Sequence, residues 1–179
     1  MQDLSVENRD SLLAEYNNIH QSCENRGNAQ NTLFIFALTA IGAILSFSLQ
    51  QHNPYIALVG FAVLIAVRCR VMWFRDSIFN DWAYLRIVIE PKLQLNSGLK
   101  RSVKETHFLS NIHYWIYTML GLGIVFTYLA NNPHDIIWFI SMIIMLVLVV
   151  VLDIYYFFGS RWVYKYYEQH WIKIKNESQ

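Results

Sequence analysis

Three ionisable residues stand at the edges of long apolar runs in this sequence. Arg68 and Arg70 end the run that starts after Pro54, and Asp153 ends the most apolar run of the chain. Charged side chains inside membrane spans commonly mark ion pathways, but at the edge of a span they can snorkel to the surface at little cost. The sequence predicts a pore mouth or gate at Arg68, Arg70 and Asp153, or simple anchoring at the membrane boundary. It also allows an ion pair between the second and fourth runs.

Little else in the sequence could do chemistry. Arg101 and His107 form an Arg-x5-His pair that resembles the motif of HEPN ribonucleases, in which paired subunits present both side chains to an RNA backbone. The remaining histidines form no closely spaced metal pair, and there is no GxSxG, HExxH or glycine-rich phosphate loop. We expect that the protein is not an enzyme and binds no metal or cofactor. A membrane-tethered ribonuclease remains a minor hypothesis, after the two that are given below.

The composition is that of a membrane protein. The 179 residues are 55% hydrophobic and 15% charged, and the mean hydropathy is +0.26, whereas soluble domains carry about 25% charged residues. No acidic or basic residue occurs from Gly27 to Val67. The formal net charge of +1 gives no basic field for nucleic acid. Cys23 and Cys69 are too few for a disulfide framework, so we expect free thiols.

Four apolar runs approach the roughly 20 residues that a membrane-crossing helix needs. They cover residues 33–49 and 55–67, a run that begins near Ile112, and residues 136–152. Polar turns at Pro54 and Pro133 divide them into two hairpins. All 14 lysines and arginines lie outside these turns, on one side of the predicted spans. The positive-inside rule then places both termini in the cytoplasm, and we expect an all-α, multi-pass fold with four transmembrane helices.

The segments around the spans are expected to form a cytoplasmic helical bundle. We predict a cytoplasmic amphipathic helix in residues 1–31, a transmembrane hairpin in 32–74, a cytoplasmic helix-loop-helix linker in 75–111, a second hairpin in 112–160 and a cytoplasmic C-terminal helix in 161–179. An apolar stripe at helical spacing marks the first of these: Leu12, Tyr16, Ile19 and Cys23. Small residues at helical spacing in the first span favour close helix contact: Thr39 with Ala43, and Gly42 with Ser46.

The linker carries motifs that resemble those of a known family. They are Ala83-Tyr84-Leu85-Arg86-Ile87-Val88-Ile89-Glu90-Pro91, Gly98-Leu99-Lys100 and Lys104-Glu105-Thr106. They resemble the cytoplasmic linker of the RipA-like family of small four-pass bacterial inner-membrane proteins, some of which are tied to intracellular growth of a pathogen. The resemblance marks Glu90 and Glu105 as linker positions without assigned chemistry. It also implies kinship with the membrane accessory proteins of type VI CRISPR systems, which form octameric pores.

We therefore expect a homo-oligomeric pore or channel-like protein of the bacterial inner membrane, acting in stress, host adaptation, virulence or antiphage defence. The resemblance implies a symmetric ring, an octamer for instance, and we expect the amphipathic faces of residues 5–26 and 75–90 to pack within it. The alternative is a non-conducting membrane scaffold that supports envelope homeostasis through an unknown cytoplasmic protein partner. The expected partners are the lipid bilayer and further copies of the chain, not nucleic acid.

Overall fold

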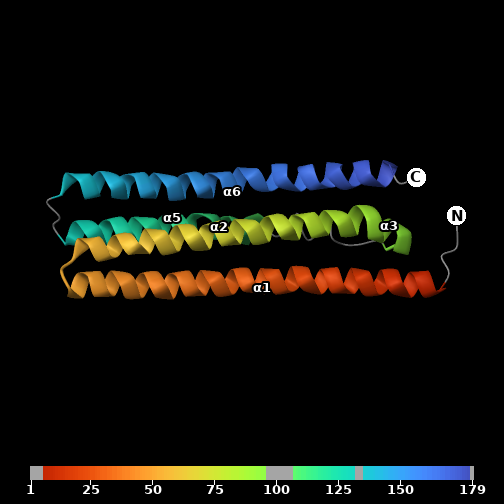
Figure 1. Ribbon diagram of the computed structural model, residues 1–179, viewed down its shortest axis with the longest axis horizontal. Coiled ribbons are helices and arrows are strands. Elements are labelled where there is room, and N and C mark those ends of the chain that lie inside the picture. The colour runs from red at the N-terminus through yellow and green to blue at the C-terminus, as the bar shows by residue number, and fades with distance from the viewer. Residues whose placement is uncertain (1–5, 96–106, 132–134, 178–179) are drawn as a thin grey trace. The chain divides into compact units, whose positions relative to one another are not determined.

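The fold is helical, as the sequence predicts. A computed structural model describes residues 6–95, 107–131 and 135–177, and this part of the chain contains no strand (Figure 1). Its elements are α1 (Val6–Gln50), α2 (Pro54–Tyr84), a π-helix η1 (Leu85–Ile89), α3 (Glu90–Leu93), α5 (His107–Ala130) and α6 (Ile136–Glu177). The predicted all-α class is therefore confirmed.

The chain divides into two compact units, which we describe separately. The apolar unit comprises Asn31–Met72 and Thr106–Gly159, and the polar unit comprises Met1–Gln30, Trp73–Glu105 and Ser160–Gln179. Twelve of the 14 basic residues and 11 of the 13 acidic residues of the sequence fall in the polar unit. The apolar unit thus has the composition of a membrane-embedded bundle, and the polar unit that of a domain in water.

Segments of α1, α2, α5 and α6 lie side by side in the apolar unit and share one core (Figure 1). Each helix contributes fully buried side chains, for example Ile41, Phe61, Ile124 and Val149. Gly60 lets α2 approach α5 closely, because a Cβ atom there would lie 3.0 Å from Cδ1 of Ile124. Side chains rather than open space therefore fill the interior of this bundle.

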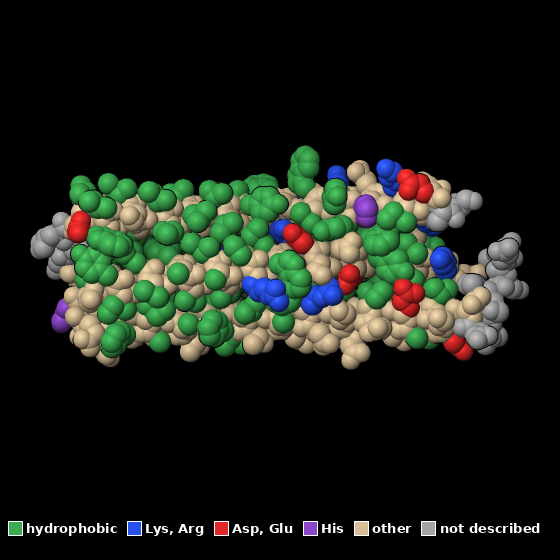
Figure 2. Space-filling model, in the orientation of Figure 1, with side chains coloured by type: hydrophobic (Ala, Val, Ile, Leu, Met, Phe, Trp, Pro, Cys, Tyr) green, Lys and Arg blue, Asp and Glu red, His purple; other side chains and the backbone are tan. Residues whose placement is uncertain are grey.

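The outside of the apolar unit is covered by large apolar side chains. Phe126, Ile136 and Ile137 are 75%, 71% and 70% exposed, and hydrophobic side chains are spread over its visible face in Figure 2. Soluble monomers rarely expose so much contiguous apolar surface. Among the described residues, three helices are long and apolar enough to cross a membrane, and Trp115–Ala130 of α5 is a shorter apolar stretch.

Local hydrogen bonds explain the turn between α1 and α2, which the sequence places at Pro54. The Ser48 hydroxyl donates to the carbonyl of Asn53 over 2.8 Å, and the Asn53 side-chain oxygen accepts the N–H of Tyr55 over 3.0 Å. His52 takes a left-handed conformation, with φ of 47°. Pro54 then begins α2, where its missing N–H has no helical partner to lose. The predicted turn is confirmed.

In the polar unit, the apolar stripe of α1 packs against the same chain. Leu12, Tyr16 and Ile19 contact the cluster formed by Leu85, Ile89 and Leu93. We expected this stripe and the face of residues 75–90 to pack within a ring of subunits. Within one chain, η1 and α3 already supply an apolar partner for these side chains, and packing within a ring stays a prediction.

Candidate functional site

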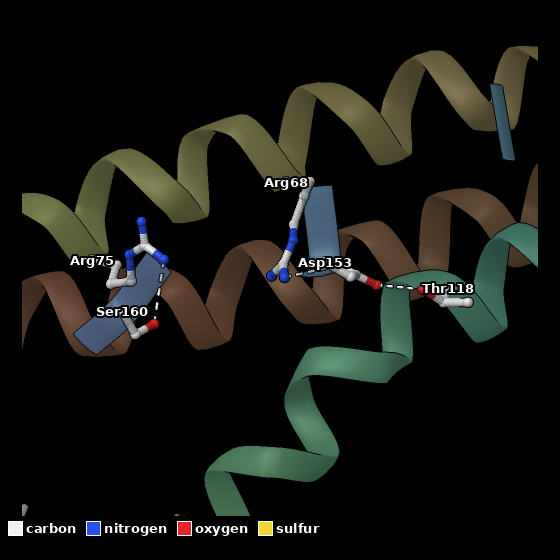
Figure 3. Close-up of polar contacts among 5 residues, drawn as sticks. All are labelled: Arg68, Arg75, Thr118, Asp153 and Ser160. Carbon is white, nitrogen blue, oxygen red and sulfur yellow. Dashed lines mark hydrogen bonds and ion pairs between the residues drawn. The ribbon is translucent and has the colours of Figure 1, made fainter. Parts of the chain in front are cut away.

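Arg68 of α2 and Asp153 of α6 form a buried ion pair in the apolar unit (Figure 3). Nη2 of Arg68 lies 2.7 Å from Oδ1 of Asp153, and each side chain is only 1% exposed. The ion pair that the sequence allowed between the second and fourth apolar runs is therefore confirmed. Snorkelling to the membrane surface would leave these groups exposed, so their burial needs another explanation.

The Asp153 carboxylate also binds α5, through Thr118 (Figure 3). Its Oδ2 atom accepts a hydrogen bond from the Thr118 hydroxyl over 2.6 Å and another from the Thr118 backbone N–H over 3.0 Å. A backbone N–H in a helix normally donates to the carbonyl four residues earlier, so Asp153 competes with the helical hydrogen bond at this point. One carboxylate thereby joins α2, α5 and α6.

Two tyrosine rings lie against the Arg68 guanidinium. Its Cζ atom lies 4.7 Å from the ring centre of Tyr117 and 4.1 Å from that of Tyr156. A guanidinium is planar and weakly hydrated, so it can stack on aromatic rings while its N–H groups face a carboxylate. A lysine could not reproduce both contacts. The site therefore requires arginine and not merely a positive charge.

Chemically, this arrangement is suited to holding helices and not to catalysis. Two opposite charges neutralise each other in an apolar interior, and this offsets the large cost of burying either one alone. With both side chains shielded, no substrate could reach them in this conformation. If the helices moved apart, however, two full charges would be exposed at once, so the pair can act as a latch between two arrangements of α2, α5 and α6.

The other predicted site residues lie elsewhere. Arg70 is exposed on α2, in contrast to Arg68 two residues earlier. Glu90 begins α3 and is 5% exposed. Arg101 and Glu105 fall outside the described residues, and so does the side chain of His107, which begins α5. Among the described residues, no group of three or more His, Cys, Asp or Glu side chains could hold a metal ion.

Sequence reasoning missed a second buried arginine, which lies in the polar unit. Arg75 is 3% exposed, and its guanidinium contacts Oδ1 of Asp76 at 2.7 Å and donates to the Ser160 hydroxyl over 3.3 Å (Figure 3). One signal was available, since Arg75 follows Arg68 by seven residues. That spacing is two helical turns and places both residues on one face of α2.

The linker contains an irregular helix that its proline explains. Pro91 lies within α3, where it lacks an N–H for the carbonyl of Ile87, four residues earlier, and its ring crowds that carbonyl. The preceding residues widen into the π-helix η1, and Nζ of Lys175 on α6 donates to the Ile87 carbonyl over 3.3 Å. The helical segment therefore continues past Pro91 to Leu93, and a side chain from α6 donates to the carbonyl of Ile87.

Comparison with known proteins adds no relative. No protein-family model, no curated protein and no solved structure matches this chain. The resemblance to the RipA-like family therefore stays a prediction from the motifs of residues 83–91, 98–100 and 104–106.

Proposed function

We propose that this chain is a membrane protein that assembles into a homo-oligomeric pore or channel-like ring, with the Arg68–Asp153 pair latching its closed arrangement. The observation that carries the proposal is an ion pair within the apolar unit, near the edges of the apolar runs, whose two side chains are each only 1% exposed. Ionisable residues inside membrane segments are rare and usually serve ion pathways, gates or relays. The pair bridges helices that would have to move for a pathway to open.

A pathway for ions would have to form between chains. Among the described residues, side chains of the core pack in the interior of the apolar unit, which favours a pathway between chains over one within a chain. On α1, the small residues that the sequence analysis noted are all exposed: Thr39, Gly42, Ala43 and Ser46. Helices in membranes associate closely through such small residues. This face of α1 therefore supports contact with a second copy.

Four spans, cytoplasmic termini and a location in the bacterial inner membrane belong to the same proposal. The distribution of lysine and arginine supports the orientation, and α5, with 24 residues, has the length for a fourth span. The linker resemblance supports a role in stress, host adaptation or antiphage defence.

Ion flux across proteoliposomes tests the latch. We expect Arg68→Ala and Asp153→Ala to change flux strongly, and the exchange Arg68→Asp with Asp153→Arg to bring it part of the way back. Arg70→Ala is the matched control, because it removes an exposed arginine of the same helix. The proposal fails if the purified protein and both single variants leave the vesicles equally tight, or if native mass spectrometry gives a monomer or dimer instead of a closed ring.

A non-conducting scaffold is the second candidate. It is favoured by apolar side chains that stay exposed in the polar unit, where water rather than lipid is expected. Leu13 is 44% exposed, Ile172 45% and Trp162 79%. A scaffold would retain a specific protein during purification and leave the membrane potential unchanged on overexpression, whereas a pore would lower it.

A further inference from the structure

The polar unit contains an open pocket of about 410 Å³ between α2 and α6. Trp73 and Asp76 line it from α2, and Tyr166, Tyr167 and His170 line it from α6. The lining shares no residue with the Arg68–Asp153 pair. Its lining combines aromatic rings with a carboxylate, a combination found where proteins recognise organic cations.

The aromatic rings are arranged as walls of this pocket. The rings of Tyr166 and Tyr167 lie 5.4 Å apart with their planes 72° to one another, so they form a corner. The ring of His170 lies nearly parallel to that of Tyr166, at 10° and 6.4 Å between centres. Trp73 is 53% exposed and Tyr166 is 65% exposed, so their rings are accessible from outside. Ring faces carry partial negative charge, which attracts a cation.

The charge of the lining points the same way. Among the described residues that line the pocket, Asp76 is the one acidic residue, and its ion-pair partner Arg75 does not itself line the pocket. Both contacts from Arg75 go to Oδ1 of Asp76, at 2.8 Å from Nε and 2.7 Å from Nη2, which orients the carboxylate. The Asp76 side chain is 36% exposed, so the carboxylate stays accessible to a ligand beside this contact. The pKa of Tyr167 is raised, first by burial and then by the negative charge of Asp76. This is expected if Tyr167 and Asp76 lie close together in the lining.

We propose that this pocket binds an organic ammonium group, carried either by a small cation such as choline or by a phospholipid headgroup. The ammonium lies against the rings of Trp73 and Tyr166 and beside the Asp76 carboxylate. An anion finds no positive side chain in the lining, and a neutral ligand gains nothing from the carboxylate. The site does not depend on whether the protein conducts ions.

Calorimetric titration of the full-length protein in a non-ionic maltoside detergent tests the site. Choline is the probe, and 3,3-dimethylbutan-1-ol, its uncharged counterpart of the same shape, is the matched ligand control. The variants are Asp76→Asn, Tyr166→Leu and Tyr166→Phe. Trp162→Leu is the control variant, because Trp162 is an exposed aromatic residue of α6 that does not line the pocket. Circular dichroism establishes that each variant keeps its helices.

We expect saturable choline binding that the uncharged alcohol does not reproduce. Tyr166→Leu should weaken it by about 3- to 30-fold, the range of a cation–π contact, whereas Tyr166→Phe and Trp162→Leu should not. Asp76→Asn should weaken it by about tenfold or more. In nanodiscs, competition by phosphatidylcholine or phosphatidylethanolamine, but not phosphatidylglycerol, would identify a lipid headgroup as the ligand. Undiminished choline binding there would identify a soluble cation. Equal binding of choline and the alcohol, or no binding of choline together with no lipid preference, would overturn the proposal.

Discussion

Removing one partner of the Arg68–Asp153 pair should destabilise the apolar unit severely. Asp153→Ala leaves the Arg68 guanidinium buried without its counter-charge and takes away the acceptor of both Thr118 hydrogen bonds. Breaking a buried ion pair in this way costs about 3 to 5 kcal/mol. Thr118→Val loses the hydroxyl bond to the carboxylate alone and keeps the backbone N–H bond, so its cost should be about 1.5 to 3 kcal/mol. We therefore expect Asp153→Ala to cost more than Thr118→Val, by about 2 kcal/mol.

Reversible unfolding in mixed micelles, followed by far-UV circular dichroism, gives these free energies. The double variant Arg68→Met with Asp153→Leu completes the cycle, because it removes both charges and retains apolar volume. We expect its free energy of unfolding to lie within about 1 to 2 kcal/mol of that of the parent protein. This loss is much smaller than the sum of the losses of the two single variants. Arg70→Ala serves as the control and should change stability by less than about 0.5 kcal/mol.

Additivity would refute the reasoning. If the double variant loses as much free energy as the two single variants together, the two side chains do not interact energetically, whatever their distance. An equally large effect of Arg70→Ala would show that any arginine near this end of the bundle matters, and that the buried position of Arg68 is irrelevant.

Three further outcomes follow from particular contacts. Gly60→Ala should destabilise the bundle by about 1 to 3 kcal/mol, because its Cβ would press on a buried isoleucine of α5. Gly27→Ala meets nothing within 4 Å and should stabilise α1 by about 0.5 to 1 kcal/mol. Unfolding in mixed micelles measures both. Cys23 lies in the polar unit, outside the predicted spans, and burial and the nearby Asp81 charge raise its pKa from 9.0 to about 11. Iodoacetamide at pH 8 should thus modify the Cys23 thiol far more slowly in the folded than in the denatured protein. The free energy of unfolding should fall as pH rises from 9 to 11, because the folded state holds the thiol proton more tightly than the unfolded state. Lys175→Met should lower the free energy of unfolding by about 1 kcal/mol. The loss should be smaller in a Pro91→Ala background, where residue 91 supplies the missing N–H, and a double-mutant cycle measures this difference.

The sequence predicted those features that depend on neighbouring residues. The turn at Pro54 follows from a polar stretch between apolar runs, and the helical class follows from the length of those runs. It also allowed the pairing of Arg68 with Asp153 beside simple anchoring, because a charge within an apolar helix can find a partner and few charges were available. In each case the candidate residues were few enough that composition and spacing were sufficient.

Features that depend on how helices rotate against one another could not be predicted. Tyr117 and Tyr156 are two of eleven tyrosines in the sequence, and their spacing does not reveal that both rings face the same guanidinium. Thr118 resembles any threonine of an apolar helix until its neighbour on α6 is known. The apolar stripe of residues 5–26 correctly predicts contact with an apolar surface. Periodicity cannot show whether that surface belongs to the same chain or to another copy.

Stability alone does not explain why a bundle of this kind keeps a buried arginine and aspartate. Apolar side chains of similar volume usually hold helices together as well as a buried ion pair does, or better. The three-helix contact of Asp153 has another property, since it favours one rotation of α2, α5 and α6 strongly and penalises intermediate ones, which leave a charge uncompensated. A latch requires that property and an anchor does not. If the double variant Arg68→Met with Asp153→Leu folds as stably as the parent and yet no longer responds as the parent does in flux measurements, the pair is kept for the change between two arrangements and not for the stability of one.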